Sequence, residues 1–392
     1  MKKALYLLIV SFLTLTVQSQ DIKKEWTRNY DESKIPAYTL PDPLLCENGH
    51  VVTSAEEWEK YRRPELLDIV KTYMYGHAPV LEHPLEYKVE IVDANFQGKY
   101  TKKNITLYLT DKNEEGPLTH AELVIPNNAK GPVPLFMIFG WGFMNQMYPS
   151  DLFLEHGYGV AILNTFEAAP DKKESFTDGL ISAYYNDKQV YRRPNEWGSL
   201  AAWAWEASRL MDYFQNDVQV DAKKVAVLGI SRLGKAALWA AAQDRRFAVV
   251  FPVNSGCGGG ALSRRMIGET VWSMNNEFPH WTCDNFQQFS LREQYMPFDQ
   301  HSVIALCAPR PIYLATAVED TWGDPKGEFL AGKGAEPVYA LYGLAGIGCE
   351  DQPAVDNAMD KGYIAYHVRS GGHGAMPYDW NQFIKFANRF LK

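Results

Sequence analysis

Ser231 stands in a short turn between two segments of different character. Before it, residues 225–228 (VAVL) form the apolar run of a buried strand, and after it residues 235–244 are strong helix formers. The turn itself, GISRLG at 229–234, has a glycine at each end, so the backbone can bend sharply there. Such a turn presents a serine hydroxyl as a nucleophile, although the same hydroxyl could instead cap the helix.

A serine nucleophile needs a base to take its proton and an acid to orient that base. His373 lies in RSGGHG at 369–374, just after an apolar run, and its neighbouring glycines make a tight, polar loop. We expect His373 to be the base, and the competing interpretation is a surface histidine. His280 and His301 are interpreted as packing or supporting residues.

Three acids lie between Ser231 and His373 in the segment VEDTWGD at 318–324. The apolar run ends near residue 318, so Asp320 falls in the turn where an orienting acid is expected. Asp324 precedes a proline and suits the N-cap of a helix, and Glu319 is expected to point away. We therefore favour Asp320, with Glu319 and Asp324 as the alternatives.

Alternating apolar and amphipathic segments predict the elements that hold these residues. Strands are expected at 135–140, 159–164, 225–228, 247–253, 311–317 and 364–368. Helices are expected at 55–73, 196–214, 235–244 and 380–391. This alternation predicts an α/β fold whose parallel sheet is covered on both faces, with ligands at the carboxyl ends of the strands.

Length and composition limit the class of protein. The chain has 392 residues, 46% of them hydrophobic and 22% charged, which is typical of a globular protein. The net charge of −8 and the absence of a basic block argue against a nucleic-acid partner.

The N-terminus predicts export. Residues 1–20 combine two lysines with a short apolar stretch, which is typical of a cleaved signal peptide of a secreted or periplasmic protein. Residues 21–85 are expected to form an extension packed on a catalytic domain at 86–392. Within that domain, the aromatic-rich segment 257–305 is interpreted as an insertion that forms a pocket. No membrane-spanning segment is expected.

The five cysteines form no Cys-x-x-Cys pair or close Cys/His cluster, so no zinc or other metal site is expected. One or two disulfides could form among them, and the sequence does not show which.

Several motifs resemble one family. The segment GISRLGKAALWAAAQDRRFAVV is similar to the elbow of glucuronoyl esterases, carbohydrate esterase family 15, in which the second glycine also comes one place later than in G-x-S-x-G. HWTCDNF, CAPRPIYLATAVEDTWGDPKGEF and RSGGHG resemble the bacterial members. The likeness covers residue 134 to the C-terminus. It implies an α/β-hydrolase three-layer sandwich with a mostly parallel sheet.

The resemblance also implies roles for individual residues. Ser231 matches the nucleophile and His373 the base, while Arg232 matches an arginine that stabilises the oxyanion. Many members carry a glutamate acid where this chain has Asn254, which places the role of the acid on Asp320.

The same resemblance implies that Lys235, Glu269 and Trp322 hold the uronate ring. It implies a serine esterase, without a cofactor, that cleaves esters between 4-O-methyl-glucuronate of xylan and lignin alcohols, and we expect a monomer. The alternatives are an acetyl-xylan or feruloyl esterase, and a non-catalytic polysaccharide-binding protein on the same scaffold.

Overall fold

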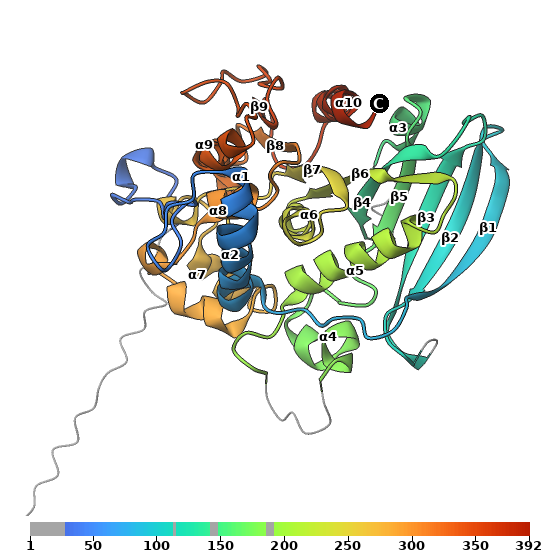
Figure 1. Ribbon diagram of the computed structural model, residues 1–392, viewed down its shortest axis with the longest axis horizontal. Helices are drawn as coiled ribbons and strands as arrows, with labels where there is room; N and C mark the ends of the chain where they lie inside the picture. Colours follow the sequence, from blue (N-terminus) through green and yellow to red (C-terminus); the bar gives the residue numbers. More distant parts are fainter. Residues whose placement is uncertain (1–27, 113–114, 142–147, 186–191) are drawn as a thin grey trace, which may run out of the picture.

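The computed structural model describes residues 28–112, 115–141, 148–185 and 192–392 (Figure 1). Within these ranges the strands form one sheet of nine, in the order β1-β2-β3-β5-β4-β6-β7-β8-β9. The strands are β1 (Glu86–Phe96), β2 (Tyr100–Tyr108), β3 (Leu118–Pro126), β4 (Val133–Gly140), β5 (Gly159–Asn164), β6 (Val220–Ile230), β7 (Phe247–Val253), β8 (Ile312–Ala317) and β9 (Ile364–Arg369).

The sheet has a parallel part and an antiparallel edge. The six strands β5, β4, β6, β7, β8 and β9 pair in parallel in that order, and each overlaps one of the six predicted runs. The sequence patterns did not assign β1, β2 and β3, which pair antiparallel with one another and with β5. The α/β-hydrolase class and the mostly parallel sheet are therefore confirmed, with an added antiparallel edge.

Helices cover both faces of this sheet and make the three layers (Figure 1). The helices α5 and α6 pack on one face, and α3 and α10 on the other. The α-helices are α1 (Ala55–Glu57), α2 (Arg63–Val70), α3 (Ser150–Glu155), α4 (Gly179–Ala183), α5 (Ser199–Phe214), α6 (Arg232–Gln243), α7 (Val271–Glu277), α8 (Gln300–Ala305), α9 (Pro325–Leu341) and α10 (Pro377–Leu391).

The N-terminal segment contributes to the main core. Trp58, Leu66 and Met74 are fully buried in the same cluster of apolar side chains as α5 and α6. The predicted signal peptide at 1–20 lies outside the described residues. Among those described, no helix has the length and hydropathy needed to cross a bilayer. All five cysteines are free thiols, so none of the disulfides left open by the sequence is formed.

The parallel strands end in register and bring four loops together. Ile230 of β6 pairs with Val253 of β7, and Val253 pairs with Ala315 of β8. Ala317 of β8 in turn pairs with Arg369 of β9. The residues that follow these ends must therefore lie at one edge of the sheet, where ligands bind in open α/β sheets.

Gly229 allows the close approach of β6 and α6. A Cβ atom there would lie 2.0 Å from the carbonyl oxygen of Leu233, far inside van der Waals contact, whereas one on Gly131 would meet nothing within 4 Å. We expect Gly229→Ala to lower the free energy of unfolding by about 1–3 kcal/mol, the usual cost of overpacking. Gly131→Ala is the matched control, and denaturant unfolding measures both. Equal midpoints for the two variants would contradict this account.

Candidate active site

Ser231 has a strained backbone held on both sides. Its φ of 61° and ψ of −128° lie in a region that residues with a side chain rarely adopt. The Ser231 N–H donates to Val253 O at 2.8 Å, and its carbonyl accepts from the N–H groups of Gly234 at 2.8 Å and Lys235 at 3.2 Å. The turn is thus bonded to β7 on one side and to the first turn of α6 on the other. This is the geometry of a nucleophile elbow.

His373 and Asp320 form a hydrogen-bonded pair beside this turn. Asp320 Oδ2 lies 2.7 Å from His373 Nδ1, and the carboxylate is buried while the imidazole remains 44% exposed. Asn254 donates its Nδ2 to the same oxygen at 3.1 Å. A bond at Nδ1 leaves Nε2 as the nitrogen that can accept a proton.

The two alternative acids serve elsewhere. The Glu319 side chain is exposed. Asp324 caps α9 through the N–H of Gly327 at 2.9 Å and pairs with Arg265 at 2.8 Å, as its position before a proline suggested.

Ser231 and His373 line the same small cavity, of about 50 Å³. Its other lining residues are Arg232, Lys235, Asn254, Gly256, Glu269, Phe278, Trp281, Trp322 and Gly323. All seven predicted site residues except Asp320 are in this lining, and Asp320 reaches it through His373. Within the described chain, no hydrogen bond joins Ser231 to His373; such bonds often tighten only when substrate binds.

The Arg232 guanidinium is fixed by an acid that sequence reasoning missed. Arg232 Nη1 lies 2.5 Å from Asp171 Oδ2, and its guanidinium carbon is 5.0 Å from the ring centroid of Trp281. The other Asp171 oxygen is bonded to His280 Nε2 at 2.7 Å and Trp281 Nε1 at 2.8 Å. Burial would raise the pKa of Asp171, but these hydrogen bonds and Arg232 outweigh it and lower that pKa to about 2.

The Lys235 ammonium is buried and fully engaged. Its Nζ donates to the carbonyls of Ser255 at 2.7 Å and Cys257 at 2.5 Å, and pairs with Glu269 Oε2 at 2.6 Å. Burial raises the pKa of Glu269, although the Lys235 ammonium opposes this. Lys235 stands in the first turn of α6, where the helix dipole disfavours a cation, and Glu269 supplies the compensating charge.

Glu328 is a second buried acid that the sequence did not reveal. Its Oε1 accepts from the N–H of Gly256 at 2.8 Å and from Ser255 Oγ at 3.2 Å, which anchors the loop that holds Lys235. Burial, together with the nearby Asp320 charge, raises the pKa of Glu328 to about 8. This shift favours the neutral form of Glu328 and so limits the negative charge beside Asp320.

A buried arginine holds the loop that carries His373. Arg369 Nη2 donates to the carbonyls of Gly372 at 3.0 Å and Gly374 at 2.5 Å, one on each side of His373. Asp379 of α10 fixes the guanidinium through Nε at 2.6 Å. A loop this rich in glycine has little rigidity of its own, so the two hydrogen bonds from the Arg369 guanidinium set its position.

No group of three or more His, Cys, Asp or Glu side chains in the described ranges could hold a metal ion.

Comparison with known proteins agrees with this geometry. The model of the fungal glucuronyl esterase family matches residues 110–343. The chain is 38% identical to carbohydrate esterase MZ0003 from an unknown prokaryotic organism, over 93% of this chain and 92% of that protein. The chain belongs to the glucuronoyl esterase family.

Two further relatives place this glucuronoyl esterase within the family. The solved glucuronoyl esterase of Solibacter usitatus is 37% identical, with a TM-score of 0.86 over 91% of this chain and 99% of that one. A 4-O-methyl-glucuronoyl methylesterase of Schizophyllum commune is 29% identical over 78% of this chain and 74% of that protein. Members of this family are carboxylic ester hydrolases, and so is this protein.

Replacing Arg369 should lower the turnover of the esterase, because the loop that carries His373 would lose the hydrogen bonds from the guanidinium. Lysine keeps the charge of Arg369 but cannot bond Asp379 and both flanking carbonyls in the same geometry. We expect Arg369→Lys to lower kcat on an ester substrate by about a hundredfold at nearly constant KM, because small misplacements of a catalytic group cost that much.

Arg389→Lys is the matched control, because Arg389 likewise donates to backbone carbonyls, at Lys361 and Gly362. Steady-state kinetics of both variants checks the idea. A similar kcat in the two variants would show that Arg369 does not position His373.

Proposed function

We propose that this protein is a serine esterase in which Ser231, His373 and Asp320 act as the catalytic triad. The observation that carries the proposal is the His373–Asp320 pair, which shares a cavity lining with a serine in a strained turn. The proposal needs no cofactor, because a hydroxyl, an imidazole and a carboxylate supply the whole chemistry of acyl transfer.

In the first step Ser231 Oγ attacks the ester carbonyl while His373 Nε2 takes its proton. Asp320 stays ionised, holds the Nδ1–H tautomer and stabilises the imidazolium that forms. The tetrahedral intermediate then expels the alcohol, which receives the proton from His373. A water molecule, activated by the same imidazole, hydrolyses the acyl-enzyme and releases the acid.

The developing oxyanion needs donors that are already in place. The Arg232 N–H is the first of α6 and follows the nucleophile, so it is one donor. The Arg232 guanidinium is the second, since Asp171 engages one of its nitrogens and leaves other donors for the substrate. Because the pKa of Asp171 is lowered to about 2, its carboxylate is ionised at neutral pH and holds this cation.

The substrate we propose is an ester of 4-O-methyl-glucuronate, attached to xylan, with a lignin alcohol. The names of the relatives support the uronate. The cavity lining supports a sugar ring, because it combines polar groups for the hydroxyls with aromatic side chains for the face of the ring. Glu269, oriented by Lys235, is the acceptor for ring hydroxyls, and Trp322 is the apolar wall. Lys235 itself has three protein acceptors, so its role in sugar binding is largely to hold Glu269.

The remaining proposals concern setting and organisation. We take residues 1–20 as a signal peptide of a secreted or periplasmic monomer, without a nucleic-acid partner. We take 21–85 as the extension, and 257–305 as the pocket-forming insertion of the 86–392 catalytic domain. Glu269, Phe278 and Trp281 of that insertion line the cavity, which supports this assignment.

The triad is tested by removing each member. Ser231→Ala and His373→Ala should each lower kcat on methyl glucuronate on the order of a millionfold, because the residues act as a unit. Asp320→Asn should lower kcat by about ten-thousandfold, since the amide favours the wrong tautomer.

Asn254→Ala is the comparison for Asp320→Asn, because it removes a neutral hydrogen bond to the same carboxylate. We expect it to cost far less turnover. Equal, small effects of the two variants would show that Asp320 is not the orienting acid. Near-normal turnover of His373→Ala would show that His373 is not the base.

Glu269→Gln separates sugar recognition from acyl transfer. Replacing a charged acceptor by a neutral one should lower kcat/KM on methyl glucuronate by about ten- to a hundredfold. On a small activated acetyl ester, which has no ring hydroxyls, the loss should be slight. Equal losses on both esters would make Glu269 a structural or catalytic residue, and better wild-type activity on acetyl or feruloyl esters would replace the proposed substrate.

A further inference from the structure

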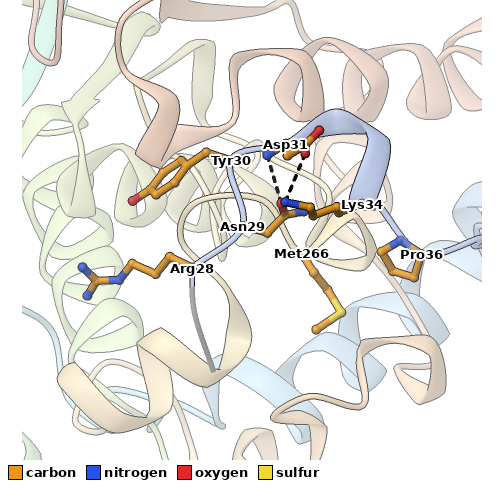
Figure 2. A pocket seen from close by; sticks show the side chains of 7 residues that line it. All are labelled: Arg28, Asn29, Tyr30, Asp31, Lys34, Pro36 and Met266. Carbon is orange, nitrogen blue, oxygen red and sulfur yellow. Dashed lines mark hydrogen bonds and ion pairs between the residues drawn. The ribbon is translucent and has the colours of Figure 1, made fainter. Parts of the chain in front are cut away.

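A second hollow, of about 640 Å³, lies where the N-terminal extension meets the insertion (Figure 2). It is lined by residues 28–31 and by Lys34, Pro36 and Met266. Its volume is in the range of sites that bind small molecules, roughly 300–1,000 Å³. None of these residues has a part in the ester chemistry.

Two residues that line this hollow, Arg28 and Asn29, contact the part of the chain that lines the catalytic cavity. The guanidinium carbon of Arg28 lies 4.6 Å from the ring centroid of Trp322, which lines the catalytic cavity. Asn29 O accepts from the N–H of Gly268 at 2.8 Å, and the next residue, Glu269, donates its N–H to Trp322 O at 2.9 Å. The hollow therefore adjoins the side of the catalytic cavity formed by Glu269 and Trp322.

The ionic groups of the hollow already have partners. Arg28 pairs with Glu277 at 2.5 Å, and Lys34 pairs with Asp31 at 3.2 Å. Figure 2 shows Lys34 beside Asp31, with Arg28 directed away from both. Since each cation has an acid beside it, the hollow offers no unbalanced charge to an ionic ligand.

The surface that remains is an aromatic ring among neutral and paired polar groups. Tyr30 is 51% exposed and belongs to the lining, where Figure 2 shows its ring directed to the same side as Arg28, away from Lys34 and Pro36. An aromatic face packs against the C–H face of a sugar, while nearby amide, carboxylate and ammonium groups bond its hydroxyls. A lignin alcohol would need a more apolar surface.

We propose that this hollow is a subsite for neutral sugar units of the glycan that carries the esterified uronate, with Tyr30 as its stacking platform. The inference rests on the proposed function, because the uronate must occupy the catalytic cavity for its glycan to cross the wall at Trp322. The subsite would make the enzyme favour uronate esters on an oligosaccharide over the free monosaccharide ester.

The experiment compares two substrates: the methyl ester of 4-O-methyl-glucuronate, and the same ester attached to a xylotriose. Tyr30→Ala should raise KM for the oligosaccharide ester about threefold to tenfold at constant kcat, the scale of one aromatic contact. It should leave both constants for the monosaccharide ester unchanged. Tyr30→Phe should keep the wild-type preference, because the ring remains.

Tyr61→Ala is the matched control, since Tyr61 is 47% exposed and lines neither cavity. Thermal unfolding of each variant establishes that it is folded. An unchanged KM for the oligosaccharide ester, or equal losses on both substrates, would overturn the subsite. Failure of the wild type to hydrolyse either ester would instead overturn the proposed function.

Discussion

The whole site depends on keeping one residue, Ser231, in a conformation that an isolated chain would leave. A φ of 61° and a ψ of −128° cost of order 1–3 kcal/mol and persist only where the surroundings over-determine them. Here β7 fixes the Ser231 N–H and the first turn of α6 fixes its carbonyl. Gly229 removes the Cβ that would separate this strand from the helix. The strain is thus sustained by the parallel sheet, and it leaves the hydroxyl at the carboxyl edge.

Around that hydroxyl, three cations each have an acid beside them. Asp171 neutralises Arg232, Glu269 neutralises Lys235, and Asp379 neutralises Arg369. Burying an isolated charge is costly, so the buried Lys235 and Arg369 need their partners to remain in the site. The pairing also fixes direction, because a guanidinium bonded on one side presents its remaining donors on the other. Electrostatic preorganisation of this kind is what an oxyanion requires.

The sequence predicted the proposed triad better than the residues that support it. Ser231, Asp320 and His373 could be proposed because each follows an apolar run and stands in a turn. Asp171 could not, since it meets Arg232 from 61 positions away and His280 from 109. Such pairings leave no local pattern. The strand β1 was missed for another reason: it is exposed along most of its length, so its apolar residues mark no buried face.

The position of the acid follows from the order of the strands. Because β7, β8 and β9 are neighbours, an acid after either β7 or β8 can reach a histidine after β9. In this chain Asn254 follows β7 and donates to Asp320, so the residue after β7 helps to orient the acid that we propose after β8. A glutamate there would place a second negative charge against Asp320, with Glu328 buried nearby. The amide of Asn254 and the raised pKa of Glu328 both limit the negative charge around Asp320, which we propose as the carboxylate that orients His373.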